Sequence, residues 1–381
     1  YLLLRDVCSA ADDGPECNAG AGAGARGSGH NISLPSMLIA KDGWLDERVT
    51  KAIGAPTFPT MPVTLPPIIG NWFDARGWRP RRHQMEMLAA ARQGDHALLV
   101  APTGAGKTLA GFLPTLADLI DHPTEGLHTL YVSPLKALAV DVRRNLLTPI
   151  EEMGLPIRVE TRTGDTPSDR KARQRARPPQ ILLTTPESLS LLLSYPDAQI
   201  MFAHLRTIIV DEVHAFATQK RGDLLNLSMA RLQTINPDLR RVALSATVAD
   251  VDAYRAWLAP DGDIGAVTPV LGEAGADPHV AILIPEGRVP WSGHSGRYAA
   301  AQVMAEIQSR GTTLIFCNTR GLAELIFQDL WSANDANLPI GIHHGSLSIE
   351  ARRTNTSSLQ IPDGTMRSLC SLSYTSLSIS L

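Results

Sequence analysis

The stretch LLVAPTGAGKTLAGFL, residues 98–113, decides the fold. It begins as an apolar run, turns through a glycine-rich loop, and continues past Lys107 and Thr108 with the apolar spacing of a helix. Glycines let a backbone approach a phosphate closely, and the N–H groups at a helix start bind anions. We therefore expect a phosphate-binding loop. The alternative is a strand–turn–helix that uses glycine only for a tight turn.

Each residue of this loop has an expected role. Lys107 should contact the β- and γ-phosphates of ATP and take part in catalysis, and the Thr108 hydroxyl should bind Mg²⁺. Ala101 stands where the general pattern has its first glycine. The residues expected to contact ATP within the loop are Thr103, Gly104, Ala105, Gly106, Lys107 and Thr108.

From about residue 71, short apolar runs alternate with helical patterns. The runs are HALLVAP (96–102), TLYVSP (129–134), ILLTTP (181–186), TIIVDEVH (207–214) and VALSAT (242–247). Strands buried on both faces are continuously apolar, and their alternation with helices is typical of βαβ units. We expect an α/β fold with a parallel sheet between two helical layers, and ligands at the carboxyl ends of its strands.

Two acidic residues end one of these runs. Asp211 and Glu212 suit a carboxylate that organises Mg²⁺ and a catalytic carboxylate that orients the attacking water. Directly after them, His214 suits a polar relay. In isolation the pair would equally suit solvated acids at the start of a loop.

Composition indicates the domain organisation and argues against a membrane protein, a zinc protein and a disulfide-rich protein. Residues 1–70 contain a Gly/Ala-rich segment and a proline-rich connector, so we expect a poorly ordered leader. A first domain is expected at 71–265, a connection at 266–295 and a second α/β domain at 296–381. No run approaches the about 18 apolar residues of a membrane span. The four scattered cysteines favour neither zinc nor disulfides and suit a reducing cytoplasm.

In order, these segments resemble the motifs of the superfamily 2 helicases. RRHQ (81–84) resembles the adenine-reading motif, and APTGAGKT resembles motif I. SPLKALAVD, TGD and TTPESL resemble motifs Ia, Ib and Ic, respectively. DEVH resembles motif II, and SAT resembles motif III. In the second domain, LIFCNTRG and HHGSL resemble motif IV and the motif after it. DEVH, KRGDLL and VPWSGHS are similar to the Lhr type, above all its ligase-associated DNA damage response branch. The resemblance covers residues 71–353 and implies RecA-like domains.

The resemblance also implies residue roles. Gln84 would read adenine, Glu212 would be the catalytic base, and Asp211 would hold Mg²⁺. The residues implied to couple hydrolysis to domain movement are His214, Ser245 and Thr247. The residues in motifs that line the nucleic-acid track are Lys136, Thr163, Gly164, Thr185 and Arg320. The basic run at 169–179 is either a solvated helix face or a further contact with phosphate backbone.

After Arg353 the resemblance ends. The last 28 residues contain eight serines and only two charged side chains, and motif VI, whose arginines reach the γ-phosphate, has no counterpart there. The tail from about 354 is either a frameshifted or truncated reading within the second RecA-like domain, or a genuine divergent ending. We expect its sheet to lack strands.

The resemblance implies an ATP-dependent, 3′-to-5′ DNA helicase or translocase of DNA repair. Its partner would be single-stranded DNA or a tailed duplex, and other repair proteins are further candidate partners. Its location would be the bacterial cytoplasm, at the nucleoid. For residues 1–381 we expect ATP binding with very weak hydrolysis. The alternatives are a non-catalytic, nucleotide-dependent binding module and an RNA helicase of the same superfamily.

Overall fold

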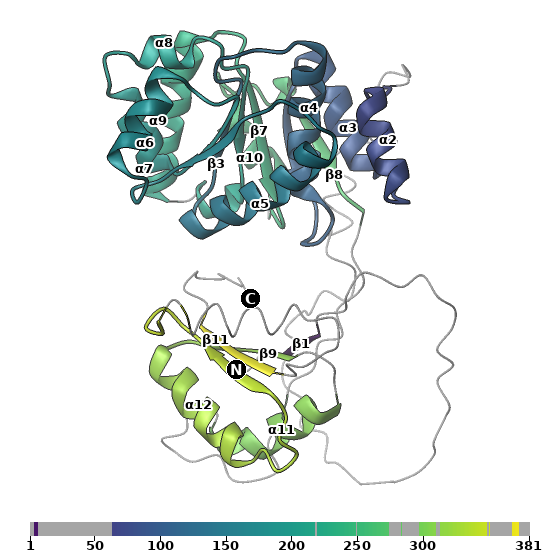
Figure 1. Ribbon diagram of the computed structural model, residues 1–381, viewed down its shortest axis with the longest axis vertical. Coiled ribbons are helices and arrows are strands. Elements are labelled where there is room, and N and C mark those ends of the chain that lie inside the picture. The colour runs from purple at the N-terminus through teal and green to yellow at the C-terminus, as the bar shows by residue number, and fades with distance from the viewer. Residues whose placement is uncertain are drawn as a thin grey trace. The chain divides into compact units, whose positions relative to one another are not determined.

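The computed structural model describes residues 4–6, 63–217, 219–248, 250–273, 283, 297–309, 313–348, 350 and 368–372. The chain divides into two compact units. The large unit comprises residues Pro35–Asp277, and the small unit comprises Tyr1–Leu34 together with Pro278–Leu381. Figure 1 shows the elements of each unit.

The large unit is built on a seven-stranded parallel sheet with the order β4-β5-β3-β6-β7-β2-β8. Its strands are β2 (His96–Val100), β3 (Thr129–Val132), β4 (Val159–Arg162), β5 (Ile181–Thr184), β6 (Thr207–Val210), β7 (Arg240–Ser245) and β8 (Val267–Leu271). The five apolar runs noted in the sequence form β2, β3, β5, β6 and β7, which confirms the expected α/β fold with a parallel sheet.

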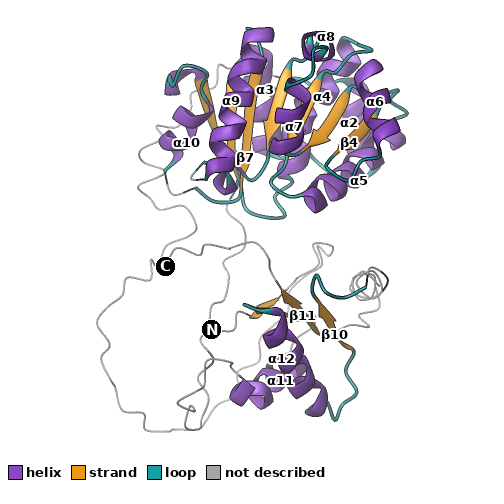
Figure 2. Cartoon of the chain, turned by 90° about the vertical axis from the view of Figure 1, so that its left-hand side faces the viewer, coloured by secondary structure: helices purple, strands orange, loops and turns teal. Residues whose placement is uncertain are grey.

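Helices cover both faces of this sheet (Figure 2). They are α2 (Pro67–Ala75), α3 (Arg82–Gln93), α4 (Lys107–Asp121), α5 (Lys136–Glu152), α6 (Ser168–Ala176), α7 (Pro186–Leu193), α8 (Ala198–Phe202), α9 (Lys220–Ile235) and α10 (Val251–Leu258), with 3-10 turns η1 (Val213–Ala215) and η2 (Ile264–Ala266). Leu99 of β2 packs with α2–α5 on one face, and Leu98 packs with α7–α10 on the other. Alternate residues of one strand thus enter different cores, which explains the continuous apolar runs.

The large unit extends beyond both boundaries expected for the first domain. The helix α2 begins at Pro67, and Val63 already packs against the core, ahead of the expected boundary at 71. The strand β8 continues to Leu271, past the expected boundary at 265. No helix in the described ranges is long and apolar enough to cross a membrane.

The small unit contains strands at both ends of its sequence. Its sheet has the order β1-β9-β11-β10, with β1 (Leu4–Asp6) antiparallel to β9 (Thr313–Cys317) and β11 (Ser368–Leu372) parallel to both β9 and β10 (Ile340–His343). The turn η3 (Arg297–Ala299) and the helices α11 (Ala300–Ser309) and α12 (Arg320–Ser332) complete the described elements.

Short strands occur in two segments of this unit where the sequence predicted little structure. The segment expected to be a leader contributes β1, and the tail contributes β11, between β9 and β10. Backbone pairing with β9 stabilises both strands, although neither has an apolar pattern long enough to be recognised alone. The Gly/Ala-rich segment, most of the expected connection and the rest of the tail lie outside the described residues.

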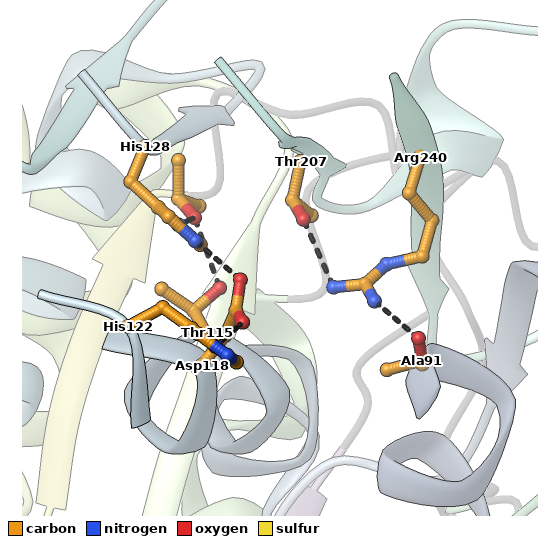
Figure 3. A network of polar contacts seen from close by, with 8 residues as sticks. Ala91, Thr115, Asp118, His122, His128, Thr207 and Arg240 are labelled. Atoms are coloured by element: carbon orange, nitrogen blue, oxygen red, sulfur yellow. Dashed lines mark hydrogen bonds and ion pairs between the residues drawn. The ribbon is translucent and has the colours of Figure 1, made fainter. Parts of the chain in front are cut away.

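A polar network spans the amino ends of three strands, opposite the edge that carries the predicted motifs (Figure 3). Asp118 near the end of α4 binds His128 Nε2 at 2.7 Å and His122 Nδ1 at 3.1 Å. Arg240 at the start of β7 donates to Ala91 O near the end of α3 and to Thr207 Oγ1 at the start of β6, both at 2.9 Å. The network therefore connects the ends of α3 and α4 to the sheet.

Candidate nucleotide and nucleic-acid site

The strand order brings the predicted nucleotide motifs together. The strands β6, β7 and β2 are neighbours, and at their carboxyl ends lie Asp211 with Glu212, Ser245 with Thr247, and the loop before Lys107. Because parallel strands end at the same edge of the sheet, the three motifs converge although 140 positions separate Lys107 from Thr247.

The glycine-rich loop adopts the backbone that a phosphate-binding loop requires. Gly104 has φ +84° and Gly106 has φ +76°, a region that residues with a Cβ rarely adopt. The ammonium of Lys107 folds back over the loop and donates to the carbonyls of Ala101 at 2.9 Å and Pro102 at 3.2 Å. The loop thus places a cation at the start of α4, where the helix N–H groups also attract anions.

The helix α3 is attached to this loop through its first turn. Gln84 is buried, its Oε1 accepts a hydrogen bond from Arg81 N at 2.9 Å, and its Nε2 lies 3.0 Å from where a Cβ on Gly106 would be. His83 Nε2 lies 2.9 Å from the carbonyl oxygen of Ala105. Burial lowers the pKa of His83, so the neutral ring donates Nε2–H to that carbonyl. His83 therefore fastens α3 to the loop, a role that the sequence motif RRHQ did not indicate.

The acidic pair lies at the end of β6 in an unusual backbone conformation. Glu212 has φ +48° and ψ +51°, the left-handed region that costs a non-glycine residue about 1–3 kcal/mol. Its Oε2 is buried, has no hydrogen-bond partner among the described residues, and lies 3.4 Å from His214 Nδ1. The neighbouring Asp211 accepts a hydrogen bond from the Tyr131 hydroxyl. A buried carboxylate oxygen without a partner is suited to bind water or a reacting proton.

The charges of this site test whether Mg²⁺ would fit. Burial raises the pKa of Asp211, against the lowering effect of Tyr131 and Lys107. Burial, and next the charge of Asp211, raise the pKa of Glu212. Burial lowers the pKa of Lys107 despite the two nearby carboxylates. The charges of buried Asp211 and half-buried Glu212 thus act on the half-buried ammonium of Lys107, and Thr108 adds a hydroxyl at the helix start. These oxygen donors fit a divalent cation of the Mg²⁺ type.

The three residues implied to couple hydrolysis to movement form one chain of contacts. Ser245 is fully buried and its hydroxyl donates to the carbonyl of Thr247 at 2.8 Å. The same oxygen lies 2.9 Å from His214 Nδ1. Since the serine hydrogen is used for Thr247, His214 must donate through Nδ1. The carbonyl of Thr247, and not its hydroxyl, takes part.

The residues expected to line a nucleic-acid track divide between the units. Lys136 begins α5 after β3, Thr163 and Gly164 follow β4, and Thr185 follows β5, so these four lie at the ends of three adjacent strands. Thr163 and Thr185 are both buried. Arg320 begins α12 of the small unit, where it donates to Ser346 Oγ at 2.6 Å. The large unit therefore has nucleotide motifs along one half of its sheet edge and these four residues along the other.

Most of the basic run 169–179 lies in the largely exposed helix α6, and several of its cations have partners within the large unit. Arg173 pairs with Glu160 at 3.2 Å, and Arg175 stacks over the Tyr195 ring at 4.1 Å. Lys171 donates to the carbonyl of Gly164 at 2.9 Å. These contacts favour the solvated helix face over a dedicated phosphate site.

The fold and the candidate site are those of a nucleotide-binding α/β domain, and comparison with known families identifies a helicase domain. Residues 81–254 match the family described as DEAD/DEAH box helicase, so the chain contains a DEAD/DEAH helicase domain.

Within this family, the chain is similar to helicases of the Lhr type. It is 38% identical over 268 residues to the Lhr helicase/probable uracil glycosylase of Mycolicibacterium smegmatis, an alignment that covers 67% of this chain and 18% of that protein. It is 33% identical over 325 residues to the ATP-dependent helicase Lhr-Core of Methanothermobacter thermautotrophicus, covering 76% of this chain and 36% of the relative.

A solved structure of an Lhr helicase is also similar to this chain. The structure of Mycobacterium smegmatis helicase Lhr bound to ssDNA and AMP-PNP matches with a TM-score of 0.67 and 34% identity over 81% of this chain and 41% of that one. The helicase MrfA bound to DNA and AMPPNP, at 22% identity and a TM-score of 0.65, shares the fold. The chain spans about a fifth to two fifths of the length of these Lhr relatives.

Proposed function

We propose that this chain is the motor portion of an ATP-dependent helicase that moves along single-stranded DNA. The observation that carries the proposal is the convergence of the glycine loop, the acidic pair and the His214–Ser245–Thr247 chain at one edge of the large sheet. The Lhr relatives support the choice of DNA, since one of them was solved with ssDNA and AMP-PNP. By family resemblance, we further propose that the protein moves from 3′ to 5′ and acts in DNA repair together with other repair proteins. Its proposed location is the bacterial cytoplasm, beside the nucleoid.

The residues of the site divide the work of ATP hydrolysis. Lys107 would exchange its bonds to Ala101 and Pro102 for bonds to the phosphates. Thr108 and Asp211 would hold Mg²⁺, which supplies Lewis-acid polarisation of the phosphate oxygens when bound. The unpartnered Oε2 of Glu212 would orient the attacking water and accept its proton.

Two further groups of residues would recognise the rest of the ligands. Gln84 would read adenine, because its amide is fixed beside the phosphate loop. The five track residues Lys136, Thr163, Gly164, Thr185 and Arg320 would contact the nucleic-acid backbone. Contacts to backbone carry no sequence information, as a translocating enzyme requires.

Replacing Lys107 tests the assignment of the site. We expect Lys107→Ala to abolish binding of a fluorescent ATP analogue, because the substitution removes the cation at the start of α4. The matched control is Lys220→Ala, which removes a lysine outside the loop and should bind as the wild type does. Unchanged binding by Lys107→Ala would refute the assigned loop.

Phosphate release and competition experiments distinguish the helicase from its alternatives. The family's γ-phosphate arginines have no counterpart in residues 1–381, so a polypeptide of these residues should hydrolyse ATP far below about 1 s⁻¹, even with DNA. Faster, DNA-stimulated turnover would contradict this expectation. Complete absence of DNA stimulation, including in a longer chain that carries those arginines, would favour a binding module. Stronger competition by RNA than by single-stranded DNA at equal salt would favour an RNA helicase.

A further inference from the structure

The segment after the acidic pair leads directly into α9 through a hydrogen-bonded turn. Ala215 N donates to Glu212 O at 2.8 Å, and Phe216 N donates to Val213 O at 2.9 Å. Phe216 is fully buried, and its carbonyl accepts a hydrogen bond from Gln219 N at 2.8 Å, at the residue before α9. The position of this turn therefore determines where α9 begins.

Gly222, in the first turn of α9, leaves no space between the helix and this segment. A Cβ on Gly222 would lie 2.1 Å from the carbonyl oxygen of Phe216 and 2.7 Å from its carbonyl carbon. Both neighbours are backbone atoms and cannot rotate away. The backbone of α9 thus rests directly on the backbone of Phe216, and a displacement of the turn must move the first turn of α9.

Arg221 connects that first turn to α7. Its Nε donates to Glu187 Oε1 at 2.6 Å and its Nη2 donates to Glu187 Oε2 at 3.2 Å, a bidentate pair that fixes the relative orientation of both side chains. Its guanidinium also lies 5.8 Å from the centre of the Phe216 ring. Glu187 is the second residue of α7, and Thr185 is the N-cap residue directly before that helix. The contacts therefore run without a gap from the acidic pair to a residue of the predicted nucleic-acid track.

We propose that Arg221, together with Gly222 and Glu187, couples nucleotide binding at the acidic pair to nucleic-acid binding at Thr185. The inference rests on the proposed function, since it requires that both ligands bind. Glu212 is the element with two states: its left-handed backbone is costly for a glutamate, so a ligand that changes its conformation shifts η1 and, through Gly222, the helix α9. Arg221 then moves Glu187 and the start of α7. Arg221 is a positioning residue, because it touches neither ligand.

A merely structural pair would behave differently when it is broken. The side chains of Arg221 and Glu187 are 37% and 54% exposed, and exposed ion pairs contribute little to stability. Removing Arg221 should therefore leave the fold intact. The change to be measured is the dependence of one ligand's affinity on the other, which a loss of stability does not alter.

The experiment measures the affinity of the full chain for a labelled oligo-dT strand with and without AMP-PNP and magnesium. For the wild type we expect AMP-PNP to strengthen DNA binding by about tenfold, within the usual range of coupled sites. In Arg221→Ala the enhancement should fall to less than about twofold, with the affinity for AMP-PNP alone unchanged. The double variant Glu187→Arg with Arg221→Glu restores the ion pair and should recover part of the enhancement.

A matched control removes an equivalent pair elsewhere in the large unit. Arg76 Nε donates to Glu152 Oε2 at 3.0 Å, in a pair that connects α2 to α5. Arg76→Ala should keep the wild-type enhancement. The inference would be overturned if AMP-PNP strengthened DNA binding by Arg221→Ala as much as by the wild type, or if Arg221→Ala and Arg76→Ala lost this enhancement equally. It would also be overturned if the wild type bound both ligands without any enhancement. A wild type that binds neither ligand would instead show that the proposed function is wrong, and the inference would fall with it.

Discussion

Tyr131 holds one carboxylate of the candidate nucleotide site in place. Its ring stacks on Phe112 of α4, with ring centroids 5.2 Å apart and 24° between the planes. Its hydroxyl donates to Asp211 Oδ2. Since Tyr131 is fully buried and protein interiors are close-packed, the ring cannot turn without opening a cavity. The carboxylate implied to bind magnesium therefore keeps a fixed orientation.

Replacing Tyr131 by phenylalanine should weaken magnesium binding and leave the core packed. Tyr131→Phe keeps the stacked ring and removes only the donor to Asp211, a hydrogen bond to a charged group worth about 1.5–3 kcal/mol. We expect the magnesium concentration that supports half-maximal nucleotide binding to rise by about tenfold. A magnesium titration of nucleotide binding measures this, with Tyr195→Phe as the control. An unchanged titration would show that Tyr131 serves packing alone.

The two helices that carry predicted nucleotide residues at their starts, α3 and α4, are both fastened at their ends. The helix α3 has Gln84 in its first turn, and near its end Ala91 accepts a hydrogen bond from Arg240. The helix α4 begins with Lys107, and near its end Asp118 binds His128. A helix held at both ends keeps its first turn in register with the sheet. The network in Figure 3 thus supports the site from the opposite edge.

The charge of Asp118 should stabilise the large unit in a defined pH range. The hydrogen bond with His128 lowers the pKa of Asp118 to about 2, below the ordinary 3.8. A lowered carboxyl pKa stabilises the folded state above pH 3.8, and the contribution is lost as the pH falls toward 2. After allowance for partial exposure, we expect Asp118→Asn to lower the free energy of unfolding by about 1 kcal/mol at pH 5–7. Urea unfolding should show this difference shrink below pH 4, and a difference that grows there would contradict it.

At the level of elements, burial determines what could be predicted. The strands β2, β3, β5, β6 and β7 lie inside the sheet and are apolar along their length, so their pattern is plain. The strands β4 and β8 were missed because they form the two edges, where half-exposed residues such as Glu160 and Pro269 interrupt the apolar run.

The candidate site likewise contains residues that the sequence pattern could indicate and residues that it could not. Residues at strand ends within a motif, such as Lys107 and Asp211, could be proposed from order and spacing, and the structure places both at one edge of the sheet. Residues defined by a partner distant in sequence could not: Tyr131 lies within an apolar run typical of core, and Arg221 meets Glu187 34 positions away.

At the scale of the whole molecule, the small unit joins distant parts of the chain, whereas the predicted nucleotide residues all lie in the large one. Leu4 pairs with Ile315, and Cys370 pairs with the same residue from the other side of β9. Strands of three to five residues carry little pattern of their own, so such pairings depend on the tertiary partner and escape sequence analysis. In contrast, the predicted ATP and magnesium residues run only from Gln84 to Glu212, within residues 35–277.

A fragment of residues 35–277 should therefore fold and bind the nucleotide without the small unit. It contains the complete seven-stranded sheet, both cores on its faces, and the network that fastens α3 and α4. We expect its affinity for AMP-PNP with magnesium to lie within about tenfold of the affinity of the full chain. A tenfold change corresponds to about 1.4 kcal/mol of binding free energy, so the proposed contacts within the large unit would still supply most of the binding. Isothermal titration of both proteins measures this, and the fragment with Lys107→Ala provides the blank. A fragment that unfolds cooperatively yet binds no AMP-PNP would show that the small unit supplies nucleotide contacts.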